Sequence, residues 1–163
     1  MFNKRQVNAI IKVLKDRSIE YRPALQRIFE KGGYLWATNG YMALELGEAK
    51  DEVKGECITL ERLVGWSGTH KSKDTTNLTE LLEDDEESEP DMVGLLHKEY
   101  TKAEDPKFNI EYMKIATDFL GVNVIALEQC SNNGSVCYRI KPLESMHVAN
   151  EAMGIKAYVM GIK

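Results

Sequence analysis

The sequence lacks the features of membrane-inserted, secreted and metal-binding proteins. No apolar run approaches the ~18 residues that a membrane-spanning helix needs, and the start, MFNK, has no apolar stretch like that of a signal peptide. There are only three cysteines, and they form neither a Cys-x-x-Cys motif nor a set at metal-ligand spacing. We therefore expect a cytoplasmic location, no membrane partner, no metal site and no cofactor.

Motifs of catalysis are also missing. The histidines His70, His97 and His147 are scattered, and there is neither a Gly-rich phosphate loop nor a Gly-x-Ser-x-Gly turn. The clustered acidic residues lack the alternation of a calcium-binding loop. Neighbouring carboxylates in a flexible tract are seldom catalytic, because catalysis needs groups that are held rigidly against a substrate. We therefore expect a binding protein and not an enzyme.

The composition is that of a globular protein, but the charge is unevenly distributed. The 163 residues are 43% hydrophobic and 29% charged, which fits one domain, 1–163, with its own core. The net charge is −5, and the acidic tract, residues 80–91, holds eight acids and no base, so the rest of the chain carries +3. The surrounding sequence is polar and rich in turn residues. We predict an acidic, partly disordered insertion at 67–105, with a short helix near 92–100, for which solubility is the ordinary explanation.

Residues 23–46 carry the clearest structural pattern. Gly32-Gly33 and Asn39-Gly40 are typical of two-residue hairpin turns, and apolar residues flank both of them. The pattern predicts three antiparallel strands, with Trp36 opposite Phe29 on one side and opposite Ala43 on the other. A further strand is predicted at 56–60, followed by the start of a short helix at 61–66.

Two amphipathic helices are predicted. Asn3 and Gln6 have the spacing of a capping box, and the apolar residues that follow recur at helical spacing to about Lys15. The basic residues of this first helix lie off its apolar stripe: Lys4, Arg5, Lys12 and Lys15. They form either an ordinary solvated face or a surface for phosphates. Asn109 is a capping residue for a second helix that reaches about Leu120, whose exposed side is slightly acidic.

The last part of the chain predicts a long hairpin and a closing strand. Strands at 122–131 and 135–141 joined at Asn133-Gly134 place Cys130 opposite Cys137 and Glu128 opposite Arg139. The closing strand covers 155–163. The two cysteines are close enough to cross-link, but a cytoplasmic setting favours free thiols. The predicted fold class is α+β, with two helices packed on one side of antiparallel strands.

Three stretches resemble one family in the expected order. They are the run LWATNGYMAL at 35–44, the run FNIEYM at 108–113 and the final YVMGIK at 158–163. Together they resemble the bacterial replicative DNA sliding clamp, the DNA polymerase III β subunit, over roughly residues 1–60 and 106–163. The resemblance implies one DNA-clamp-like domain with a duplicated β-α-β-β-β plan, in a single-domain version from a phage or mobile element.

The resemblance also implies partners and sites. The first helix would line a channel for double-stranded DNA, where Lys4, Arg5, Lys12 and Lys15 meet the backbone without reading sequence. Clamps close a ring from six domains, so six copies of one domain would be needed. The closing strand would border a pocket for peptides of replication proteins, made by Tyr158, Val159, Met160 and Ile162, with Gly161 where clamps have proline. The alternative is that these residues are only a core-facing edge strand.

The sequence thus favours a sliding-clamp-like processivity factor in DNA replication. The slightly acidic second helix departs from the clamp pattern, in which both helices help to make a positive channel. The alternative is a clamp-fold regulator or inhibitor that binds a replication protein through the acidic tract without encircling DNA. A third reading is a structural module that keeps only the fold.

Overall fold

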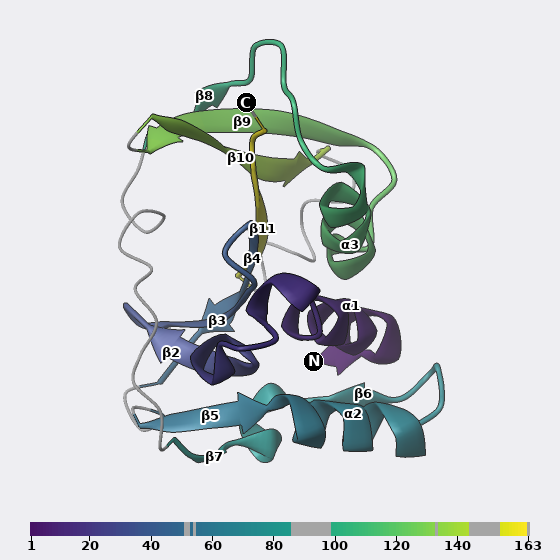
Figure 1. Ribbon diagram of the computed structural model, residues 1–163. Helices are drawn as coiled ribbons and strands as arrows, with labels where there is room; N and C mark the ends of the chain where they lie inside the picture. Colours follow the sequence, from purple (N-terminus) through teal and green to yellow (C-terminus); the bar gives the residue numbers. More distant parts are fainter. Residues whose placement is uncertain (51–52, 54, 86–98, 133, 144–153, 163) are drawn as a thin grey trace.

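The computed structural model describes residues 1–50, 53, 55–85, 99–132, 134–143 and 154–162 (Figure 1). Within them the chain has a mixed α+β architecture, with three α-helices and a large antiparallel sheet. Half of the acidic tract, residues 86–91, and most of the predicted helix near 92–100 fall outside the described residues.

The α-helices are α1 (Lys4–Leu14), α2 (Leu60–Thr69) and α3 (Ile110–Leu120). The strands are β1 (Phe2–Asn3), β2 (Arg27–Lys31), β3 (Tyr34–Thr38), β4 (Met42–Glu48), β5 (Glu56–Thr59), β6 (Thr75–Thr76), β7 (Glu83–Asp84), β8 (Thr101–Lys102), β9 (Ile125–Asn132), β10 (Ser135–Pro142) and β11 (Ile155–Met160). Short 3-10 helices cover Arg17–Ile19, Pro23–Leu25 and Leu78–Leu81.

The order of the strands is symmetrical about the centre of the sheet. The nine-stranded sheet has the order β7-β5-β2-β3-β4-β11-β10-β9-β8, and β1 pairs separately with β6. Two runs of three consecutive strands, β2 to β4 and β9 to β11, therefore meet through their third strands. Each run follows a helix, α1 in the first half and α3 in the second.

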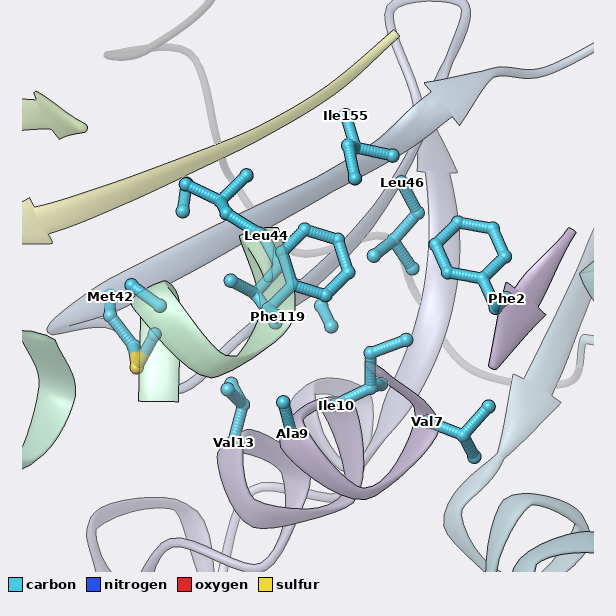
Figure 2. Close-up of a cluster of buried hydrophobic side chains, with 14 of the residues drawn as sticks. Phe2, Val7, Ala9, Ile10, Val13, Met42, Leu44, Leu46, Phe119 and Ile155 are labelled. Carbon is cyan, nitrogen blue, oxygen red and sulfur yellow. The ribbon is translucent and has the colours of Figure 1, made fainter. Parts of the chain in front are cut away.

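Helices α1 and α3 pack against each other on one face of the sheet, as the sequence predicts. Figure 1 shows α1 between α3 and α2. The main buried cluster fills the space between the helices and the sheet, and Phe119 of α3 projects there toward side chains of α1 and β4 (Figure 2). This packing stabilises the fold mainly through the hydrophobic effect, because it removes apolar area of both the helices and the sheet from water.

The predicted capping box holds the start of α1. Asn3 Oδ1 accepts a hydrogen bond from Gln6 N at 3.0 Å, and Gln6 Oε1 accepts one from Asn3 N at 3.1 Å. The same glutamine donates from Nε2 to the carbonyl of Phe119 at 3.1 Å. One buried amide therefore both caps α1 and joins it to the end of α3.

The opposite face of the sheet carries a second buried cluster, made by Phe29, Trp36, Ala43, Cys130, Cys137 and Tyr158. The pairing of Phe29 with Trp36 is confirmed, and so is the pairing of Cys130 with Cys137 and of Glu128 with Arg139. Because both faces of the central strands are buried, the sheet is an interior layer and not a half-exposed surface.

The predicted register of the second hairpin is wrong by two residues. Trp36 lies opposite Glu45 and not opposite Ala43. The reason is the side chain of Asn39, which is buried and whose Oδ1 accepts hydrogen bonds from Tyr41 N and Met42 N, both at 2.9 Å. The two central residues of the turn are therefore Gly40-Tyr41 and not the predicted Asn39-Gly40. An asparagine whose side chain accepts hydrogen bonds from the backbone N–H groups that follow it favours such a turn.

The segment predicted as an insertion is structured where it is described. Helix α2 continues through Ser67 to Thr69, β6 and β7 pair with β1 and β5, and β8 pairs with β9. Leu78 is buried in the main cluster, and Leu81 and Leu82 pack against it. These leucines hold the segment in place because they add to a buried cluster that consists mostly of residues from other elements.

Candidate nucleic-acid interface

The exposed side of α1 is a stripe of polar and basic side chains. Arg5, Asn8, Lys12 and Lys15 are exposed at helical spacing, while Val7, Ile10 and Leu14 are buried, together with three further residues of the helix. The stripe runs along the length of α1, which lies between α2 and α3 (Figure 1). Over the ten residues from Arg5 to Lys15 a helix rises about 15 Å, enough to pass several phosphates of a nucleic-acid strand.

The four basic residues predicted to contact DNA fall into two pairs. Lys4 Nζ donates to the carbonyl of His70 at 2.6 Å, and Arg5 Nη2 lies 2.7 Å from Asp118 Oδ1 of α3. These two side chains join α1 to its neighbours. Within the described residues Lys12 and Lys15 form no ion pair, so their charges face solvent.

Helix α3 adds little positive charge to this surface. Glu111 and Lys114 are exposed, and Asp118 is engaged by Arg5. The slightly acidic side of the second predicted helix is therefore partly neutralised by α1. The most positive part of the surface is the last turn of α1, together with the exposed Arg17 that follows it.

A hydrogen-bond network anchors this end of α1. Asp16 accepts hydrogen bonds from Ser18 N at 2.8 Å and from Asn39 Nδ2 at 3.0 Å. Burial by itself raises the pKa of Asp16, but hydrogen bonds from Ser18, Tyr112 and Asn39 outweigh it and hold the pKa below its ordinary value. The carboxylate therefore joins α1, the 39–41 turn and α3. Sequence reasoning did not find this site, because its members are distant in the chain.

Replacing Asp16 with Asn should reduce the pH dependence of stability in acid. The lowered pKa means that Asp16 stabilises the native state above its unfolded pKa of about 3.9, and that this contribution is lost as the pH falls through the lower folded pKa. Chemical denaturation between about pH 5 and pH 2 should show a shallower slope for the variant, with about 1–2 kcal/mol lost at pH 7. Equal slopes for variant and wild type would contradict the network.

The residues predicted to form a peptide pocket do not line one groove. Tyr158 and Val159 are buried on opposite faces of β11, in the two different clusters. Strand β11 pairs with both β4 and β10, so it is a central strand and the edge-strand alternative is wrong. Met160 is partly buried, and only Ile162 is exposed. Alternation along a strand sends adjacent side chains to opposite faces, which is why Val159 cannot share a surface with Tyr158 and Met160.

Gly161 is held where clamps carry a proline. Its N–H donates to the carbonyl of Val136 at 2.7 Å, which proline cannot do. A Cβ at this position would lie 3.2 Å from the same carbonyl oxygen and from the ring of Tyr138. Close approach of the backbone to β10 therefore leaves little room for a side chain at this position.

The first residues of the acidic tract are bound within the chain. Asp85 forms an ion pair with Arg27 of β2, and both side chains are almost fully buried. Glu83 lies 3.4 Å from Arg62 of α2 at the surface. These two acids are engaged inside the protein, whereas the rest of the tract after Asp85 is outside the described residues. Sequence reasoning missed Arg27, although its alternation with Phe29 along β2 places both on the same face.

The cysteine pair on the second sheet face is buried. Cys130 and Cys137 are both free thiols, and burial raises the pKa of Cys137 to about 12, with a further increase from the nearby Cys130. Both thiols lie beside Tyr100, whose ring also packs near Tyr158 and under Arg139. A thiol that stays protonated is a poor nucleophile, so the pair acts as apolar packing.

Among the described residues, no helix combines the length and apolarity needed to cross a bilayer. In the same part of the chain, no three His, Cys, Asp or Glu side chains gather closely enough to hold a metal ion. No protein-family model matches the sequence, and neither the curated proteins nor the solved structures give a match to it.

Proposed function

We propose that this protein is a DNA sliding-clamp-like processivity factor that contacts the phosphate backbone through the exposed side of α1. The observation that carries the proposal is the position of Lys12 and Lys15, which are exposed and form no ion pair with any described residue. They lie on a helix beside a second helix, on one face of a continuous sheet. Contacts of lysine with phosphate bind nucleic acid without reading its sequence, which is what a protein that slides along DNA needs.

The arrangement of elements supports the proposal. The orders β1-α1-β2-β3-β4 and β8-α3-β9-β10-β11 are the same, and the two units meet at β4 and β11. This order is compatible with the duplicated plan that the resemblance to sliding clamps implies, although β1 pairs with β6 whereas β8 pairs with β9. The paired helices of the two units then form one surface, which is the side of a clamp domain that faces DNA.

Encircling DNA would require several copies of this domain. The outermost described strands of the sheet are β7, with Glu83 and Asp84, and β8, with Thr101 and Lys102. In a ring, the open backbone groups of these two edges would pair between successive copies. A ring of six would have about six times the chain mass of 18.5 kDa in solution.

The alternative is a clamp-fold regulator that binds a replication protein. The observation in its favour is the ion pair between Arg5 and Asp118, which removes one positive charge from the surface and leaves α3 near neutral. The engagement of Glu83 and Asp85 within the chain weakens the role of the acidic tract in such binding. The regulator would have a monomeric mass and no affinity for duplex DNA.

The proposal is tested by the salt dependence of binding to duplex DNA. Replacing Lys12 and Lys15 together with Ala should weaken binding uniformly across sequences and lower the slope of log K against log salt by about 1–2. Replacing Lys4 with Ala should change the slope less, because its ammonium group already donates to the carbonyl of His70. Fluorescence anisotropy of a labelled duplex over a range of salt concentrations measures both effects.

The matched control is the double replacement of Lys141 and Lys156 with Ala. It removes the same charge, but each lysine lies beside a carboxylate, Glu128 or Glu45, on the opposite face of the sheet from the helices. Duplex binding by this variant should follow the wild type once the change in net charge is allowed for. If the wild type shows no salt-sensitive association with duplex DNA even at low ionic strength, the exposed side of α1 is an ordinary solvated face.

A further inference from the structure

The exposed Tyr41 stacks on the half-buried Tyr112 near the C-terminal end of α1. The rings of Tyr41 and Tyr112 are nearly parallel, 12° apart with centroids at 6.3 Å, and Tyr41 is 55% exposed. Tyr41 comes from the turn between β3 and β4, and Tyr112 comes from the first turns of α3. The pair therefore presents a flat apolar face of Tyr41 to solvent, backed by a second ring.

The backbone around Tyr41 is fixed by its neighbours. Tyr41 N donates to Asn39 Oδ1 at 2.9 Å, and the Tyr41 carbonyl accepts from Met160 N at 2.8 Å. Tyr112 lies close to Asp16, and burial together with that carboxylate raises the pKa of Tyr112 to about 12. The two rings therefore form a rigid platform, and a ligand that stacks on it loses little freedom of the protein.

Two basic residues lie close to the platform along the chain. Asp16 contacts both Asn39 of the turn and Tyr112, so its neighbours in sequence, Lys15 and Arg17, flank the platform, and both are exposed. The charge of Asp16 itself is engaged by the hydrogen bonds that it accepts. Two exposed acids are near the platform in sequence. Glu111 directly precedes Tyr112, and Glu20 follows three residues after Arg17.

We propose that Tyr41, stacked on Tyr112 and flanked by Lys15 and Arg17, binds an unpaired nucleobase of single-stranded nucleic acid. An aromatic face beside basic residues is the arrangement that binds single strands with little sequence preference, since every base has a flat face and every nucleotide carries a phosphate. Bases inside a duplex are already stacked on each other and cannot use the platform. The site would thus add binding of single strands to the duplex contacts of α1. This inference rests on the proposed function, in which the protein binds DNA.

The test compares a labelled twelve-nucleotide oligo(dT) with a duplex of the same length at low ionic strength. Tyr41→Ala should weaken binding of the oligo(dT) by about 5- to 100-fold, the loss expected for one stacked base, and leave duplex binding unchanged. Tyr41→Phe should keep the affinity, because it preserves the ring. Tyr21→Ala is the matched control, since Tyr21 is 90% exposed.

A second measurement does not depend on any variant. Oligo(dT) with 5-iodouracil at one position, irradiated in complex with the wild-type protein, should cross-link to the peptide that contains Tyr41. Cross-links only elsewhere, or equal affinity of wild type and Tyr41→Ala for oligo(dT), would overturn the platform. If duplex binding remains salt-sensitive in that case, the proposed function stands without it. Two results together would support the proposed function and the platform. Replacing Lys12 and Lys15 should lower the affinity for both nucleic acids, and Tyr41→Ala should lower only the affinity for the single strand.

Discussion

Replacing Arg27 with Met is expected to lower the free energy of unfolding by about 3–5 kcal/mol, because it leaves the carboxylate of Asp85 buried without its guanidinium. The exposed fractions of the two side chains are 4% and 8%, so water cannot replace the lost partner. The Arg27 side chain also donates from Nε to the carbonyl of Ala24 at 3.3 Å, a contact that methionine cannot make. Urea denaturation at pH 7, with the slope compared between variant and wild type, measures the loss.

Two further variants separate the buried charge from general damage. The double variant Arg27→Met with Asp85→Leu should recover most of the stability, because a pair of apolar side chains in a buried site is often as stable as the ion pair it replaces. Arg62→Ala, which breaks the exposed pair with Glu83, should cost less than about 1 kcal/mol. Similar small losses for Arg27→Met and Arg62→Ala would show that Asp85 is not held in the buried pair.

The second large effect is expected for Phe119→Ala, which should cost about 3–5 kcal/mol. Phe119 is fully buried between α1, α3 and the sheet, and its ring stacks on Phe2 with centroids at 6.2 Å (Figure 2). The change removes the apolar contacts of the ring and leaves a cavity at the joint of the two helices. Thermal or urea denaturation monitored by circular dichroism gives the difference.

The controls for Phe119 test both size and position. Phe119→Leu keeps most of the apolar volume and should cost distinctly less. Ile110→Ala removes an apolar side chain from the same helix, but Ile110 is 71% exposed, so the change should lie within about 0.5 kcal/mol. A loss below 1 kcal/mol for Phe119→Ala would mean that α3 does not pack on the sheet through this residue.

Local signals in the sequence were sufficient for the helices and for one hairpin. The capping box of Asn3 and Gln6 is a short-range hydrogen-bond pattern, so it predicted the start of α1 correctly. The hairpin of Cys130 and Cys137 follows from an Asn-Gly turn and alternation, and its register is the predicted one. The predicted three-stranded run, the two capped helices and the hairpin of Cys130 and Cys137 together predicted that both helices pack on one side of the sheet, where α1 and α3 lie.

The candidate site was predicted only as a set of basic residues. Their position on the exposed side of α1 follows from helical periodicity, which is a property of the sequence. Which of them are engaged depends on side chains far away in the chain, because Lys4 meets His70 and Arg5 meets Asp118. No spacing within α1 carries that information, so the separation of Lys12 and Lys15 from the other two required the structure.

The sequence by itself determined the α+β class, the capped helices and the exposed basic stripe, because these depend on residues close together in the chain. The tertiary structure alone decided three features: the turn at Gly40-Tyr41, the central place of β11, and the buried pair of Arg27 and Asp85. Each depends on contacts between segments that the chain brings together only when it folds. A side chain such as Asn39 or Asp16 has several hydrogen-bonding choices, and its distant neighbours determine which of them forms.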